Sequence, residues 1–88
     1  MQTYIESKEL RRVVIRLQKP HSSFFYFIME SNDNIAFYST LKESIDRDHR
    51  DVQVTVTPEF SKSLDNIIKH FETRYPVEYI SDIIINED

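Results

Sequence analysis

Residues 19–23 combine side chains and backbone groups that bind anions. Lys19, His21, Ser22 and Ser23 lie where a predicted strand ends and a predicted helix begins. The first turn of a helix presents free backbone N–H groups, and the helix dipole favours negative charge there. These residues therefore form the candidate binding site, for the phosphate or carboxylate group of a small ligand. The simpler interpretation, which stays open, is a polar strand-to-helix turn with ordinary capping.

A second candidate is Glu30, an acid near the end of the same predicted helix. A carboxylate is unfavourable at a helix C-terminus because the helix dipole is negative there, so Glu30 needs a partner. We expect it to accept a hydrogen bond near the helix end or to pair with a base. A role in ligand binding is the alternative, because acids in unusual surroundings often mark functional sites.

The loop over residues 46–51 reads D-R-D-H-R-D and contains cation ligands of the right types. It lacks the glycine turn and the distal glutamate of an EF-hand loop, however, and its two arginines repel a cation. We therefore interpret it as a solvated hairpin loop and predict no metal site.

The composition excludes several kinds of catalytic and binding site. The chain has no glycine, so glycine-rich phosphate-binding loops are excluded. It has no cysteine, so it holds no thiolate nucleophile, cysteine metal site or disulfide. Serine, histidine and aspartate are present, but no spacing places a nucleophile beside a base. We predict no catalytic residue and no cofactor, and the sequence leans towards a protein that is not an enzyme without deciding it.

Length and charge narrow the class of protein further. The 88 residues fit a single domain over residues 1–88, with residues 1–10 as an N-terminal extension and 86–88 as a C-terminal tail. The net charge of −4 argues against a nucleic-acid binder that neutralises phosphates. No apolar leader is present, and the apolar runs are too short to span a membrane. Together with the absence of cysteine, this favours a cytoplasmic protein.

The apolar periodicity predicts four strands and two helices. Alternation indicates strands over residues 11–18, 35–41, 52–57 and 77–85, and spacings of three and four indicate helices over residues 22–31 and 57–75. In the first helix, Phe24, Phe27 and Ile28 form the predicted core-facing stripe, with Phe25 and Met29 on its flank.

This order of elements predicts a ferredoxin-like β-α-β-β-α-β sandwich of the α+β class. We expect a four-stranded antiparallel sheet in the order four-one-three-two, with both helices on one face. Arg12 and Arg16 on the first strand oppose Glu78 and Asp82 on the fourth. Opposite charges on neighbouring strands stabilise by about a few tenths of a kcal/mol per pair, which supports the adjacency of these two strands.

With the elements placed, part of the chain resembles a known family. Residues 24–40 read F-F-Y-F-I-M-E-S-N-D-N-I-A-F-Y-S-T, and residues 54–60 read V-T-V-T-P-E-F. Together they resemble a family of short bacterial proteins known as domain of unknown function 4911. In that family an apolar helix ends in a glutamate, here Glu30, and a strand runs into a proline-acid-phenylalanine helix start, here residues 58–60. The resemblance covers about residues 12–74, implies a bacterial source and implies no activity.

The predicted sheet has more apolar residues than one face can bury. Val14, Tyr38, Ile80 and Ile84 are expected on the face opposite the helices, and Phe25 and Met29 on the helix flank are expected to extend that surface. Exposed apolar patches usually mark partner surfaces, and most soluble oligomers are symmetric homo-oligomers. We therefore predict a non-enzymatic interaction or regulatory module, resembling the ACT-like branch of this topology, that forms a homodimer or binds another protein through the open sheet face.

Two alternatives belong to other classes of function. One is a sensor of a small anionic ligand, or a weak enzyme, that uses residues 19–23. The other is single-stranded nucleic-acid binding through Arg12, Arg16 and Tyr38, which the acidic net charge makes the less favoured reading.

Overall fold

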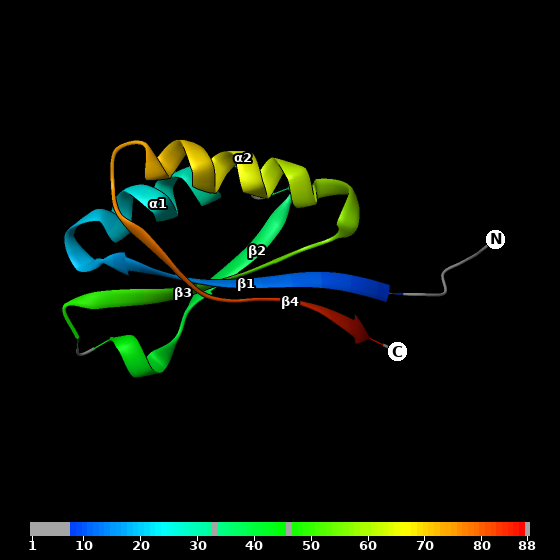
Figure 1. Ribbon diagram of the computed structural model, residues 1–88, viewed down its shortest axis with the longest axis horizontal. Helices are drawn as coiled ribbons and strands as arrows, with labels where there is room; N and C mark the ends of the chain where they lie inside the picture. The colour runs from blue at the N-terminus through cyan, green and yellow to red at the C-terminus, as the bar shows by residue number, and fades with distance from the viewer. Residues whose placement is uncertain (1–7, 33, 46, 88) are drawn as a thin grey trace.

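The structure is a computed structural model that describes residues 8–32, 34–45 and 47–87 (Figure 1). The elements in chain order are β1 (Lys8–Gln18), α1 (Lys19–Ser31), β2 (Ala36–Thr40), η1 (Lys42–Ser44), β3 (His49–Val56), η2 (Pro58–Phe60), α2 (Ser61–Glu72) and β4 (Val77–Glu87). The elements η1 and η2 are short 3₁₀ turns. Strands β1 and β4 are longer than predicted, because β1 begins at Lys8 and β4 runs to Glu87. Residues 1–7 of the predicted extension, and residue 88 of the tail, lie outside the described residues.

The four strands form one antiparallel sheet in the order β2-β3-β1-β4. Both α-helices lie on the same face of this sheet (Figure 1). The ferredoxin-like fold, the strand order and the placement of the helices are therefore confirmed. We call the face opposite α1 and α2 the open face.

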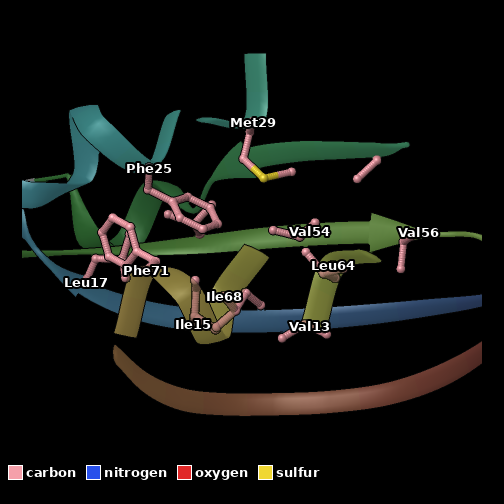
Figure 2. Close-up of a cluster of buried hydrophobic side chains, with 12 residues drawn as sticks. Val13, Ile15, Leu17, Phe25, Met29, Val54, Val56, Leu64, Ile68 and Phe71 are labelled. Carbon is pink, nitrogen blue, oxygen red and sulfur yellow. The ribbon is translucent and has the colours of Figure 1, made fainter. Parts of the chain in front are cut away.

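The core lies between the sheet and the two helices (Figure 2). Val13, Ile15 and Leu17 of β1 are at most 1% exposed, because alternate residues of a strand point to the same face. The side chains that meet them from the helices are Phe25, Met29, Leu64, Ile68 and Phe71. Full burial of an aliphatic or aromatic side chain stabilises a fold by about 1.5–3 kcal/mol, so this layer supplies most of the stability.

Helix α1 presents a different face to the core from the predicted one. Phe25 and Met29 are 0% exposed, whereas Phe24 and Phe27 are 43% and 67% exposed. The prediction that Phe25 and Met29 extend an outer surface is therefore wrong. Apolar residues cover more than half the turn of this helix, so spacing alone did not fix its orientation.

Strand β2 also faces the opposite way from the prediction. Tyr38 pairs with Val54, a core residue, and therefore points towards the helices. Phe37 points to the open face and is 81% exposed. The segment is apolar at both parities, so its sequence did not determine the register, which the pairing with β3 sets. The predicted place of Tyr38 on the open face is wrong.

A register shift in β4 exchanges the faces of the sheet to which its later residues point. Tyr79 pairs with Ile15 and Ser81 pairs with Val14, which leaves Ile80 as an extra residue between them. Beyond the shift, Ile84 pairs with Arg11 on the helix side of the sheet. Ile84 is therefore exposed at the sheet edge but does not lie on the open face, contrary to the prediction.

The same shift rearranges the predicted charge pairs between β1 and β4. Arg16 lies opposite Glu78 on the open face, in agreement with the predicted adjacency of opposite charges, but Arg12 lies opposite Ile83. Asp82 turns to the helix side and accepts two hydrogen bonds from Arg11, at 2.9 and 2.7 Å. The prediction that Asp82 lies on the open face is wrong.

Candidate interaction surface

The open face carries a row of side chains that crosses all four strands. The pairing places Phe37 beside Thr55, Thr55 beside Arg12, and Arg12 beside Ile83. Phe37 and Ile83, at the two ends of this row, are 81% and 50% exposed. Large apolar side chains with this exposure, on a face that neither α-helix covers, are typical of a contact surface.

The next row along the strands consists of shorter side chains. Its members, in strand order, are Ser39, Gln53, Val14 and Ser81. Val14 lies on the open face as predicted, but it is only 8% exposed, because it occupies the middle of the sheet between Arg12 and Arg16. Val14 therefore forms the floor of the surface and does not project from it.

A third row is charged. Arg16 donates two hydrogen bonds to Asp51, from Nε at 2.8 Å and from Nη2 at 3.0 Å. This hydrogen-bonded guanidinium lowers the pKa of Asp51 below its ordinary value. Glu78 lies beside Arg16 on the other side. The row therefore alternates in sign across the sheet.

Arg12 differs from its two arginine neighbours on β1. Its Nε lies 3.4 Å from the hydroxyl of Thr55. The ion pairs found within residues 8–32, 34–45 and 47–87 involve Arg11, Arg16 and His49, and none involves Arg12. Arg12 thus lies in the same row as Phe37 and Ile83, and its guanidinium is available to a hydrogen-bond acceptor from outside the domain.

The predicted anion corner has lost part of its binding capacity to internal hydrogen bonds. The backbone N–H of Lys19 donates to the carbonyl oxygen of Asp48 at 2.9 Å. The Ser22 hydroxyl is buried and donates to the carbonyl oxygen of Lys19 at 2.8 Å. Only the Lys19 ammonium, His21 and the exposed Ser23 remain for a ligand. The corner is better explained as the strand-to-helix turn that the sequence left open.

His21 packs against Tyr75, in the turn that follows α2, instead of facing a ligand pocket. Its ring centroid lies 4.4 Å from that of Tyr75. Its Nδ1 atom is buried and has no hydrogen-bond partner among the described residues. The contact ties the start of α1 to the turn before β4, and spacing along the chain gave no signal for it.

Glu30 has the partner that its position required. It accepts a short hydrogen bond from the Tyr38 hydroxyl, whose ring stacks on Tyr26 with a centroid separation of 5.6 Å. This hydrogen bond raises the pKa of Tyr38 to about 12. The expected hydrogen bond near the helix end is confirmed, and a tyrosine rather than a base provides it. With Tyr38 engaged on the helix side, the nucleic-acid alternative loses its aromatic residue.

Hydrogen bonds from side chains to the backbone hold the loop between β2 and β3. Arg50 donates to the carbonyl oxygens of Ser44 and Arg47, at 3.0 and 3.1 Å. Asp46 lies outside the described residues. Among the residues that the structure does describe, no three histidine, aspartate or glutamate side chains are placed to hold a metal ion.

Of the predicted surface residues, Ile80 is 43% exposed at the register shift. The residues that sequence reasoning missed are Phe37 and Ile83. The predicted placement of Tyr38 and Ile84 on the open face put Phe37 and Ile83 on the helix side by alternation, because β2 and β4 are apolar at both parities. Within the described part of the chain, no helix is long and apolar enough to cross a membrane.

Comparison with known proteins identifies the fold and no family. No protein-family model and no curated protein match the chain. Its fold is similar to that of CPII, a nitrogen regulatory PII-like protein from Thiomonas intermedia K12, whose structure contains ADP, AMP and bicarbonate. The TM-score is 0.71 at 13% sequence identity, over 96% of this chain and 100% of CPII.

Two further structures share the fold. The periplasmic domain P4 of SecDF has a TM-score of 0.66 at 9% identity, over 97% of this chain and 96% of that domain. The Staphylococcus aureus protein SA1388 has a TM-score of 0.60 at 14% identity, over 93% of this chain but only 25% of its own. These likenesses establish the ferredoxin-like fold, and at such low identities they carry no function over to this chain.

Proposed function

We propose that this chain is a non-enzymatic interaction or regulatory module that self-associates through the open face of its sheet. The observation that carries the proposal is the row of Phe37, Thr55, Arg12 and Ile83, which crosses the whole sheet with both of its apolar ends exposed. The regulatory role is part of the proposal, and the PII-like regulatory protein CPII shares the fold alone. The bacterial source, the cytoplasmic location and the resemblance to domain of unknown function 4911 stay predictions.

A second copy complements this face in one simple arrangement. A two-fold axis that runs along the strands, between β1 and β3, lays each β2 over the partner's β4. Phe37 of each copy then contacts Ile83 of the other, because the two residues occupy the same row. Residues on β1 lie over residues on β3, so Arg12 approaches Thr55 of the second copy.

The charged row fits the same arrangement. Arg16 of one copy lies over Asp51 of the other, and the relation repeats in the opposite direction. Like charges are not brought together, and the short middle row allows two sheets to approach to about 10 Å. Such a two-fold contact is isologous, the commonest type in soluble oligomers.

The test is the solution mass of the protein by light scattering over a wide concentration range. The variant Phe37→Asp places a charge at the centre of each apolar contact and is expected to remove the open-face contact, which lowers the solution mass. Phe27→Asp is the matched control, because Phe27 is also a phenylalanine and is 67% exposed, but it lies on α1. Far-UV circular dichroism verifies that both variants fold.

Either of two results contradicts the proposal. One is a wild-type protein that stays monomeric at the highest concentration. The other is a dimer that Phe37→Asp leaves intact while Phe27→Asp dissociates it, which moves the contact to the helix layer.

A further inference from the structure

The two edges of the sheet differ in length and in protection. Strand β2 has five residues and β4 has 11. Within the described residues, nothing pairs with the outer edge of β4. Unpaired edge strands template pairing with another chain, and proteins usually protect them with lysine, proline or short length. Strand β4 contains no lysine, arginine or proline.

The register shift protects only the first part of β4. It falls at Ile80, and from Ser81 onwards the strand pairs regularly with β1. This regular segment carries Ile83 and Ile84, which are 50% and 60% exposed and point to opposite faces of the sheet. A strand added at this edge would therefore bury apolar surface on both faces.

We propose that β4 of one copy pairs with β4 of a second copy, antiparallel and centred on Ile84. An antiparallel edge pair related by a two-fold axis keeps both helix layers on the same side of the joined sheet. Directly opposed residues must then share a face. The two-fold axis must therefore pass between two copies of the same residue, and each allowed register is named by that central residue.

The sequence of the segment selects one of these registers. Centring on Asp82 opposes two aspartates, and centring on Ile83 sets Asp82 against Ile84. Centring on Ile84 opposes the two Ile84 side chains, pairs Ile83 with Ile85 twice and pairs Asp82 with Asn86 twice. This is the register that matches apolar with apolar and polar with polar throughout. The occupant is therefore a second copy of this chain.

This edge contact is a backbone pairing along the outer side of β4. It shares only Ile83 with the open-face row, and it can form without the open-face contact. If both contacts form, the edge contact joins open-face dimers into larger assemblies, because the two axes do not meet. Asp82 is already neutralised by Arg11, so the paired edge brings no uncompensated charge together.

The chain contains no cysteine, so a single introduced thiol reports on the register. In the Phe37→Asp background, which removes the open-face contact, Ile84→Cys is expected to form an intermolecular disulfide under mild oxidation with copper phenanthroline. Opposed residues on paired strands have Cβ atoms about 4.5–5.5 Å apart, close to the separation that a disulfide needs. Ile80→Cys, on the same strand at a position that is 43% exposed against 60% for Ile84, is the control and is expected to cross-link at least roughly tenfold more slowly.

The result that overturns the inference is equal cross-linking of the two thiols, or none, in that background. Faster cross-linking of Ile83→Cys than of Ile84→Cys also overturns it, because two Ile83 residues are not opposed in the proposed register. Failure of the open-face proposal is separate, since it is read without any thiol, as an equal mass for the wild type and the Phe37→Asp variant. A Phe37→Asp mass that falls below that of the wild type but stops at a dimer is the result expected when both contacts exist.

Discussion

The two faces of the sheet are formed by the same strands, but one is packed against the helices and the other is uncovered. On the helix side, the apolar residues of β1 and β3 are at most 2% exposed and are packed by α1 and α2. On the open side, alternate residues form rows that mix apolar, small and charged side chains. Stability is therefore concentrated on one face, which leaves the other free to vary for recognition.

The sharpest test compares one phenylalanine on each face of the sheet, and it has the largest expected effect. Phe25 is 0% exposed on the helix side and Phe37 is 81% exposed on the open side. Phe25→Ala is expected to lower the free energy of unfolding by about 3–5 kcal/mol, and Phe37→Ala by about 0.5 kcal/mol or less. Urea unfolding at low protein concentration measures both, since dilution keeps association from adding to stability.

Equal losses from Phe25→Ala and Phe37→Ala would contradict the division of roles between the faces. If Phe25→Ala does not fold, Phe25→Leu serves as the milder substitution at the same site.

Two consecutive arginines on β1 give the next largest difference. Arg11 is 14% exposed and contacts Asp82, Asp65 at 2.8 Å and the Ser61 hydroxyl at 2.8 Å, which anchors the start of α2 to the sheet. Arg11→Met is expected to cost about 1–2 kcal/mol, a value reduced by the solvent exposure of both carboxylates. Arg12→Met, on the open face, is expected to change stability by less than about 0.5 kcal/mol. Chemical unfolding that ranks the two in the reverse order would contradict this assignment.

Acid is expected to weaken both faces through one carboxylate on each. Hydrogen bonds from Arg11 and Arg16 lower the pKa of Asp82 and of Asp51. A carboxyl with a lowered folded-state pKa stabilises the fold above its unfolded value of about 3.9, and this stability is lost as the pH falls through the folded value. The free energy of unfolding should therefore decrease below about pH 4.

The contribution of each face can be separated by amide substitution. Asp82→Asn and Asp51→Asn are each expected to reduce the dependence of stability on pH in the acid range, measured by urea unfolding at several pH values. An acid dependence that neither variant changes would mean that other carboxylates cause it.

The smallest expected effect concerns Tyr38 on the helix side. The hydrogen bond to Glu30 raises the pKa of Tyr38 from 10.0 to about 12. Burial also raises the pKa of Tyr79. Absorbance titration should therefore show late ionisation of both tyrosines, and Glu30→Gln should return Tyr38 alone towards 10. Because the raised pKa favours the neutral phenol in the folded state, the associated stability is lost as the pH rises from about 10 to 12. An unchanged titration in Glu30→Gln would contradict the role of this hydrogen bond.

The sequence was sufficient for the fold because periodicity and chain order survive local errors. Strand β3, with Val52, Val54 and Val56 alternating with polar residues, was assigned to the correct face. The open face was predicted poorly for a physical reason. Strand β2, the end of β4 and helix α1 are apolar on more than one side, so only their packing partners determine which side is buried.

The register shift at Ile80 had the largest consequence for the surface. A single extra residue in β4 exchanged the faces of Asp82, Ile83 and Ile84. The local sequence does not predict such a shift, because the shift arises from the pairing of β4 with β1. Before the shift, Glu78 lies on the open face as predicted.

The most direct test of the central claim is the concentration dependence of backbone amide chemical shifts. If the open face is the contact surface, dilution should move the signals of residues in the row of Phe37, Thr55, Arg12 and Ile83 and leave the outer surface of the helices unchanged. Changes confined instead to the apolar groove between the helices, which is lined by Phe24, Ile28 and Ile67, would contradict the account.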